Sequence, residues 1–230
     1  MLSSKSMKKI IGNPFETNQK LIELIKRLKI NNFYLKNNKD FRDQILKDIN
    51  IKDEILDIGK AMRDKYNEIV CKNVETLDVN DFGAYPDIVC DICADVTQLE
   101  NKYDKIICIA ILEHVYDPFK AVFNLKRMLK NNGRIYGYVP YLFYYHAPTD
   151  LKFQDYLRFS KDALAYLFRD FNDVELYPIR GRISSSFNIM FAGRWKNYME
   201  KTNINILLDK LSNNEKNQKQ CSGFNFIVKK

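Results

Sequence analysis

The chain has 230 residues, 46% of them hydrophobic and 29% charged, which is enough for one globular domain with a sizeable core. Its net charge of +8 favours acidic partners, but the basic residues are spread along the chain without a block. We therefore expect a solvated basic surface rather than a dedicated nucleic-acid groove. No apolar run approaches the roughly 18 residues of a membrane span, and the N-terminal residues show no signal-peptide pattern. A cytoplasmic protein without a transmembrane segment is predicted.

The cysteines form an odd set of five, which we expect to be reduced thiols. Cys90 and Cys93 make a single C-x-x-C pair, with no second pair and no nearby histidine to complete a zinc site. We interpret them as buried or half-buried thiols rather than metal ligands or a redox pair.

Residues 14–50 carry two helical patterns. Apolar residues recur at helical spacing over 21–28 and again over 41–49. We interpret the two helices as a packing layer, or a lid, ahead of the first strand.

Short apolar segments then alternate with helical ones, which is typical of a parallel sheet with helices on both faces. The strands are expected at 54–58, 74–78, 88–90, 104–112, 134–140, 174–179 and 223–229, and the later helices at 119–130, 160–171, 187–198 and 204–211. The fold class is α/β: a doubly wound, mostly parallel, seven-stranded sheet with an antiparallel edge strand. We expect one domain over 1–230, with a helical layer (1–50), a core (51–180) and a C-terminal part (181–230).

The central feature is the stretch 103–118, YDKIICIAILEHVYDP. Its apolar, β-branched run predicts a strand that is buried on both faces. The run stops at Glu113 and His114, two ionisable groups that need partners if they are buried. Because ligands of open α/β sheets bind beyond the carboxyl ends of central strands, this point is a candidate site.

Three acidic residues also fall at or just after predicted strand ends: Asp57, Asp78 and Asp95. In a doubly wound sheet such ends line one crevice. Gly59 lets the backbone approach a ligand closely. The carboxylate of Asp78, at the second strand, suits a ribose diol, and the carboxylate of Asp95, after the third strand, can accept a hydrogen bond from an adenine amine. The pattern therefore predicts a site that fits a nucleoside.

The order and spacing of these pieces resemble the class I S-adenosylmethionine-dependent methyltransferases, and more narrowly their type 11 group, over about residues 50–180. The pieces are LDIG (56–59), TLD (76–78), ADVTQL (94–99), YDKII (103–107), ILEHVYDP (111–118) and LKNNGRI (129–135). VPYLFYYHAPTD (139–150) and DYLRFSKDAL (155–164) look like pieces of members found with glycan or cell-surface polysaccharide genes.

The resemblance implies a Rossmann-like methyltransferase fold with S-adenosyl-L-methionine as cofactor. Asp57 and Gly59 are implied to bind the methionine part of the cofactor, and Asp78 is implied to bind the ribose. Asp95 and Val96 are implied to bind the adenine. Cys108 and Ile109 are implied to lie beneath the sulfonium. His114 is implied to lie near the transferred methyl group. One departure is the loop after Gly59, where Ala61 replaces an expected second glycine and a third is absent. This loop weakens the expectation of cofactor binding, and it argues against a dinucleotide oxidoreductase.

The chain has only two histidines, His114 and His146, and both follow strands that end at the predicted crevice. Methyl transfer to a hydroxyl needs a base for its proton, so both are candidate catalytic residues, with a structural role as the alternative. Glu113, His114 and Asp117 offer metal-ligand types, but three ligands on one short turn spread poorly around an octahedral ion, so no metal is predicted. Asp155 and Arg158 are candidates for acceptor contacts or for an ordinary ion pair.

We therefore predict a methyltransferase for a small polar acceptor, such as a sugar hydroxyl in glycan or cell-surface polysaccharide synthesis. One alternative is a non-catalytic relative that binds or assembles, and another is a nucleic-acid methyltransferase, although an Asn/Asp-Pro-Pro-aromatic signature is missing at Pro140-Tyr141. The aromatic face of 187–198 is interpreted as core, with a membrane surface or a partner as the alternative. The oligomeric state stays open.

Overall fold

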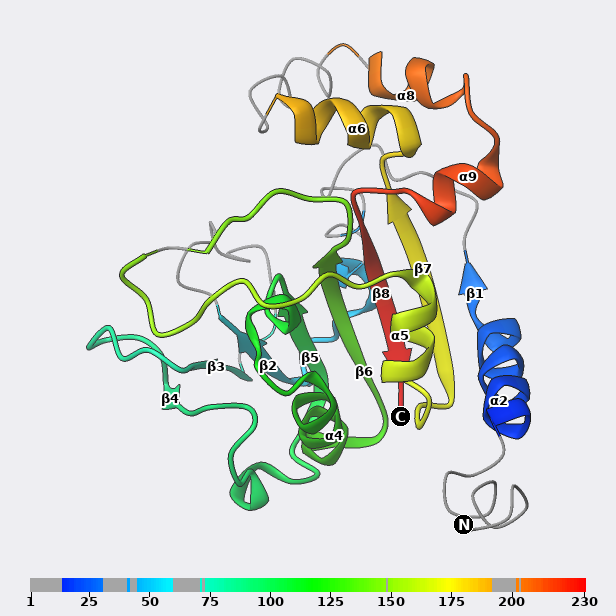
Figure 1. Cartoon of the computed structure of the whole chain (residues 1–230). Helices are drawn as coiled ribbons and strands as arrows, with labels where there is room; N and C mark the ends of the chain where they lie inside the picture. The colour runs from blue at the N-terminus through cyan, green and yellow to red at the C-terminus, as the bar shows by residue number, and fades with distance from the viewer. Residues whose placement is uncertain are drawn as a thin grey trace, which may run out of the picture.

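The computed structural model describes residues 14–30, 41, 45–59, 71, 73–147, 149–191, 202 and 204–230, and every structural statement below refers to these residues. Their strands form one eight-stranded sheet in the order β1-β7-β8-β6-β5-β2-β3-β4 (Figure 1). The strands are β1 (Lys29–Ile30), β2 (Glu54–Ile58), β3 (Asn73–Asp78), β4 (Ile88–Val89), β5 (Tyr103–Ile109), β6 (Leu129–Pro140), β7 (Asp173–Ile179) and β8 (Gly223–Lys229).

The predicted doubly wound, mostly parallel sheet is confirmed, and its late strand is antiparallel as expected, but this strand lies inside the sheet and not at the predicted edge. β8 pairs with β6 on one side and with β7 on the other, so β7 and the short β1 lie outside it toward that edge. A strand on each side suits β8, because Phe224, Phe226 and Val228 are fully buried. The eighth strand is the two-residue β1, which was not predicted; it pairs with β7 beyond α2 (Pro14–Arg27).

The core lies on both faces of the sheet. On one face, α4 (Pro118–Met128) and α5 (Lys161–Leu167) pack over the strands, as Figure 1 shows. On the other face, Phe41 and Ile45 of the second N-terminal helical pattern pack against Ile55, Ile107 and other buried side chains. The described part of the second expected helix therefore packs on this face of the sheet.

The ends of several elements differ from their predicted positions for local reasons. β5 stops at Ile109, three residues early, because Ala110 adopts a left-handed φ of 55°. α4 ends at Met128, two residues before the predicted end, and its C-cap Leu129 is already extended, while the left-handed Asn132, with φ 64°, lies within β6. The Asp117 carboxylate caps α4 by accepting the Lys120 N–H over 3.0 Å.

Three helices lie beyond the carboxyl end of β7: α6 (Arg182–Met190), α8 (Ile204–Asp209) and α9 (Asn214–Lys219) (Figure 1). α6 begins five residues before the predicted start at 187, and residues 192–198 of that prediction lie outside the described residues. None of the described helices combines the length and the apolar character needed to cross a bilayer.

Candidate active site at the carboxyl ends of the strands

Gly59 follows β2 and needs to be glycine for two reasons. Its φ is +66°, a conformation that side chains disfavour, and a Cβ atom built on it would lie 2.1 Å from Cδ1 of Ile111. Its N–H donates to the Leu77 carbonyl over 2.8 Å, which ties the turn to β3. The close approach brings the end of β2 against the segment that follows β5. Asp57, which was predicted to bind cofactor, lies just before this turn and is almost fully buried.

Asp78 ends β3 and is nearly buried, with 7% of its surface exposed. Its Oδ1 accepts from the backbone N–H and the side-chain amide of Asn80, over 2.9 and 3.2 Å. The Tyr85 hydroxyl lies 3.5 Å from Oδ2. The carboxylate is thus fixed at a strand end, where a ligand with vicinal hydroxyls could meet it.

Asp95 and Val96 precede the short 3-10 turn η1 (Thr97–Leu99) and face different surroundings. Asp95 is exposed, and its Oδ1 accepts from the Thr97 hydroxyl over 2.6 Å and from the Thr97 N–H over 3.1 Å. The hydroxyl bond is the main reason why the pKa of Asp95 lies below its ordinary value. Val96 is buried in the core.

Cys108 and Ile109, at the end of β5, also differ. The Cys108 side chain is fully buried in the core, so only its backbone can face a ligand. Ile109 is partly exposed. All five cysteines of the chain, including Cys90 and Cys93, are free thiols. The expectation of half-buried or buried thiols at this pair is confirmed.

The turn after β5 places Glu113 at the centre of a polar cluster. Ala110 leaves the strand in its left-handed conformation, and the 3-10 turn η2 (Leu112–His114) follows. Non-glycine residues rarely hold such a φ, and those that do often lie at functional sites. Glu113 is 0% exposed, and neither oxygen of its carboxylate has a hydrogen-bond partner among the described residues.

Two imidazole rings surround this carboxylate. Nε2 of His146 lies 3.6 Å from Oε1 of Glu113, and Nε2 of His114 lies 3.9 Å from the same oxygen. The two rings are in edge-to-face contact, with centroids 4.9 Å apart. The close approach of the Glu113 carboxylate as an acceptor is the largest cause that raises the pKa of His146; burial lowers this pKa, and Asp155 and the Tyr144 carbonyl raise it further.

Asp155 and Arg158 complete the cluster behind His146. The Asp155 side chain is fully buried, and Oδ2 lies 3.1 Å from Nδ1 of His146. Nη2 of Arg158 donates to the same oxygen over 2.6 Å, and Nη1 pairs with Oδ1. Burial acts to raise the pKa of Asp155, but Arg158 and His146 outweigh it and hold this pKa at about 2.

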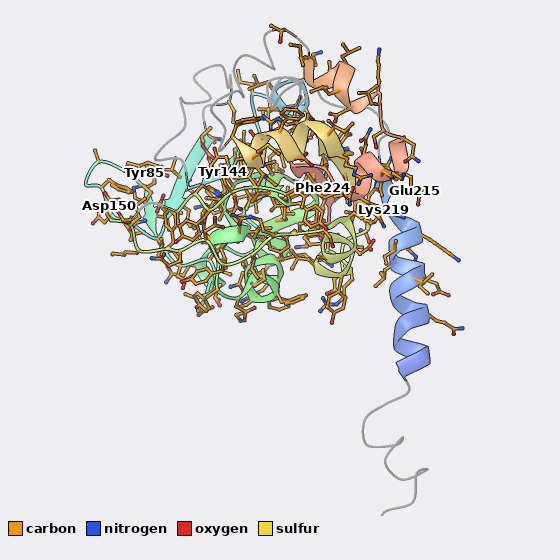
Figure 2. All side chains as sticks on the ribbon, turned by 45° about the horizontal axis from the view of Figure 1, so that its top comes forward. Tyr85, Tyr144, Asp150, Glu215, Lys219 and Phe224 are labelled. Atoms are coloured by element: carbon orange, nitrogen blue, oxygen red, sulfur yellow. The ribbon has the colours of Figure 1, made fainter. Side chains whose placement is uncertain are left out.

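The segment between β6 and α5 (residues 141–160) is here named the covering segment. It connects the Glu113 cluster with the residues around Asp78 at the end of β3. Its Tyr156 and Leu157 N–H groups donate to the Glu113 carbonyl, over 2.8 and 3.1 Å. Further along, the Lys152 N–H donates to Oδ1 of Asn80 over 3.2 Å, next to Asp78. In Figure 2 the labelled Tyr85 and Asp150 lie at the same side of the molecule. The covering segment therefore runs from the Glu113 cluster to the end of β3.

Comparison with known proteins shows which domain and fold this chain resembles. Residues 44–137 match the model of a type 11 family that is described as a methyltransferase domain. This part of the chain is similar to a methyltransferase domain. The predicted resemblance to the class I S-adenosylmethionine-dependent methyltransferases, type 11 group, is thereby confirmed.

Solved methyltransferases share the fold. Phosphoethanolamine N-methyltransferase 2 of Haemonchus contortus, in complex with S-adenosyl-L-methionine, has a TM-score of 0.52 at 15% identity, over 84% of this chain and 52% of that chain. An S-adenosylmethionine-dependent methyltransferase from Mesorhizobium loti has a TM-score of 0.50 at 11% identity, over 85% of this chain and 98% of that chain. This chain thus spans about half the length of the Haemonchus chain. No curated protein matches the sequence.

The sequence indicated most members of the polar cluster around Glu113 one by one, but not their arrangement. His114 and His146 do come together, as expected of two histidines beyond strands of one crevice. Asp117 does not join Glu113 and His114, because its carboxylate caps α4. Asp155, considered as an acceptor contact or an ion-pair residue, pairs with both Arg158 and His146. The altered loop at 60–63 lies outside the described residues.

Proposed function

We propose that this methyltransferase transfers the methyl group of S-adenosyl-L-methionine to an oxygen of a small polar acceptor, such as a sugar hydroxyl. One observation carries the proposal: a fully buried Glu113 carboxylate lies between two imidazoles beside the Gly59 turn. Such a cluster suits the one task that a hydroxyl acceptor adds to the reaction, the removal of its proton.

The proposed cofactor site runs along the strand ends. Asp78 holds the ribose hydroxyls with its fixed carboxylate, and the Gly59 turn faces the methionine part without a Cβ in the way. The other proposed contacts are Asp57 beside that turn, Asp95 and Val96 at the adenine, and the Cys108 backbone with the Ile109 side chain beneath the sulfonium. The complex of the Haemonchus enzyme with S-adenosyl-L-methionine supports this cofactor for the shared fold.

The chemistry is an in-line displacement. The acceptor oxygen attacks the methyl carbon, the carbon–sulfur bond breaks with its electrons left on sulfur, and the hydroxyl proton leaves. Alignment of donor and acceptor supplies much of the rate, and a positioned base supplies a further factor. His146 is the stronger candidate base, because Asp155 and Arg158 hold its ring from behind. His114 borders the same space, with its ring against Phe153.

The acceptor class rests on the similarity of 139–164 to enzymes of glycan synthesis and on the geometry of the covering segment. His146 lies in this segment next to a run of aromatic residues, Tyr141, Phe143, Tyr144 and Tyr145. Phe143 and Tyr144 stack with centroids 4.3 Å apart, and Phe143 meets the His146 ring edge-on at 5.3 Å. Aromatic faces beside polar groups suit a sugar ring.

Calorimetry with S-adenosylmethionine and S-adenosylhomocysteine tests the cofactor part of this proposal. Saturable heat with both ligands is expected. The absence of heat with either one at near-millimolar concentration contradicts the enzyme function and favours a non-catalytic relative. For the acceptor, a panel of nucleotide sugars, free sugars, small amines and RNA is incubated with labelled cofactor. Label in an oxygen of a sugar supports the proposal, and label only in an amine or in RNA contradicts the acceptor class.

A further inference from the structure

The Glu113 carboxylate has no satisfactory partner among the described protein groups. It is 0% exposed, yet neither oxygen has a hydrogen-bond partner there. Buried carboxylates are normally paired, hydrogen-bonded or bound to a metal, and a buried polar group with none of these is rare. The nearest basic atoms, Nε2 of His146 and of His114, lie 3.6 and 3.9 Å away, too far for hydrogen bonds.

These separations are close to those between the ligands of one metal ion. Bonds of about 2.0–2.2 Å from a tetrahedral zinc ion place neighbouring ligand atoms about 3.4 Å apart. The ligand atoms of Glu113, His114 and His146 all lie within 4.8 Å of one another. Small side-chain shifts therefore bring all three into coordination distance of a single ion.

The opposite ring nitrogens are arranged as in metal-binding histidines. Nδ1 of His114 lies 2.8 Å from the Gln154 carbonyl, which can only accept, so the proton sits on Nδ1. Nδ1 of His146 lies 3.1 Å from Asp155 and 3.3 Å from the Tyr144 carbonyl, again two acceptors. Both neutral rings consequently direct the lone pair of Nε2 toward Glu113. A carbonyl or carboxylate on the second nitrogen is the usual outer partner of a histidine that binds metal.

We propose that Glu113, His114 and His146 bind one divalent transition-metal cation of the Zn²⁺ type. Two imidazoles and one carboxylate suit this class better than Mg²⁺, which prefers oxygen ligands alone. Sequence reasoning excluded a metal because three ligands on one turn spread poorly. The structure removes that objection, because His146 comes from the covering segment and replaces Asp117.

Three protein ligands leave a fourth position open, as in catalytic zinc sites. The binding of the cation does not depend on the proposed function, but its role in the reaction rests on that function. An acceptor hydroxyl at the open position has a lowered pKa and gives its proton to solvent, after which the oxygen takes the methyl group. In this state the two imidazoles act as ligands, and His146 no longer serves as the base.

The test measures Zn²⁺ binding by the full chain, expressed without a polyhistidine tag and stripped by a chelator. Titration calorimetry is expected to show one site per chain, and no saturable binding at millimolar Zn²⁺ overturns the proposal. Glu113→Gln and His146→Gln are each expected to weaken binding by about 100-fold or more, and Asp155→Asn, which removes an outer partner, by about 10–100-fold. Unchanged Zn²⁺ affinity in Glu113→Gln and His146→Gln overturns the proposal.

Two controls separate this site from adventitious binding. The double variant Cys90→Ser/Cys93→Ser removes the C-x-x-C thiols, and Glu215→Gln removes an exposed carboxylate on α9. Both are expected to keep wild-type Zn²⁺ affinity, and loss of the site in the cysteine variant overturns the proposal. If Glu113→Gln fails to fold, Co²⁺ bound to the wild-type chain decides. A thiolate charge-transfer band contradicts the proposal, and its absence with bound Co²⁺ supports it.

The same preparations distinguish a failure of the proposed cation site from a failure of the proposed function. If the chain does not bind Zn²⁺ and methyl transfer continues at full rate in chelator, the proposed cation site is wrong. The proposed function is not affected by this result. Zn²⁺ bound by this cluster in a chain that gives no heat with S-adenosylmethionine supports the site and overturns the proposed function.

Discussion

Asp155 and His146 are joined twice: the backbone N–H of His146 donates to Oδ2 of Asp155 over 3.0 Å, and Nδ1 of the same ring lies 3.1 Å from that oxygen. One carboxylate therefore fixes both the backbone and the ring of a proposed site residue. The Asp155 side chain is fully buried, so its charge depends on Arg158 for compensation.

Arg158→Ala is expected to lower the free energy of unfolding by about 2–3 kcal/mol, because it leaves a buried carboxylate without its guanidinium. The loss is somewhat below that for a wholly buried pair, since 25% of the Arg158 side chain is exposed. Arg158→Lys keeps the charge but not the two-pronged contact, and we expect an intermediate loss. Urea denaturation measures both. Equal stability of Arg158→Ala and the wild type would show that the pair is not needed to hold Asp155.

The same pair predicts a dependence of stability on acid. The folded pKa of Asp155 is about 2 and the unfolded value is about 3.9. A depressed pKa gives stability that is complete above the unfolded value and is lost as pH falls from about 4 through 2. In metal-free protein, the free energy of unfolding should fall less steeply over this range in Asp155→Asn, by on the order of 1 kcal/mol after solvent screening. Parallel wild-type and variant curves contradict the assignment.

The turn after β2 gives a prediction about backbone conformation. Gly59→Ala is expected to cost about 1–2 kcal/mol for its positive φ, with a further cost because the new Cβ would lie 2.1 Å from Ile111 Cδ1. The double variant Gly59→Ala/Ile111→Ala lacks the steric contact but keeps the backbone strain. Its loss of stability relative to Ile111→Ala alone therefore measures the cost of the strain. Thermal unfolding and cofactor calorimetry measure both effects. A wild-type melting temperature for Gly59→Ala would contradict the conformation of this turn.

Sequence reasoning placed the strands well because each is a local apolar run. It placed several boundaries less well, because distant groups decide them. β5 was predicted to reach Leu112, but Ala110 turns left-handed beside β6, where its N–H still donates to the Tyr138 carbonyl over 2.9 Å. α6 was predicted from its aromatic spacing alone, whereas its start is fixed by Asp209, from a later helix.

The candidate site shows the same limit. The two residue types that stop the apolar run, glutamate and histidine, were visible in the sequence, and so was His146. Their meeting was not, because it depends on the path of the covering segment, which is fixed by the Tyr156 and Leu157 N–H groups on the Glu113 carbonyl. Asp117 was equally plausible by type and spacing, and only its hydrogen bond to α4 excludes it.

Asp78 gives a prediction about cofactor affinity. Asp78→Ala is expected to weaken S-adenosylmethionine binding by about 10–100-fold, because it removes a charged acceptor for the ribose hydroxyls. Asp81→Asn is a matched control, since Asp81 is an exposed carboxylate on the same loop that accepts the Gly83 N–H over 2.8 Å. It should bind cofactor as the wild type does. Equal calorimetric affinities for Asp78→Ala and the wild type would show that the ribose lies elsewhere.

Asp209 anchors the helices beyond β7. Its buried carboxylate accepts the Gly181 N–H over 2.6 Å and the Ser184 N–H and hydroxyl over 3.0 and 2.5 Å, so it caps α6 from another helix. Asp209→Ala leaves two buried N–H groups without partners and should lower the free energy of unfolding by about 2–4 kcal/mol. Ser184→Ala removes one bond and should cost about 1 kcal/mol. Because this cap lies beyond β7 and not at Asp78, the folded Asp209→Ala variant should bind cofactor with unchanged affinity. A loss of cofactor affinity without a loss of stability would contradict this structural role.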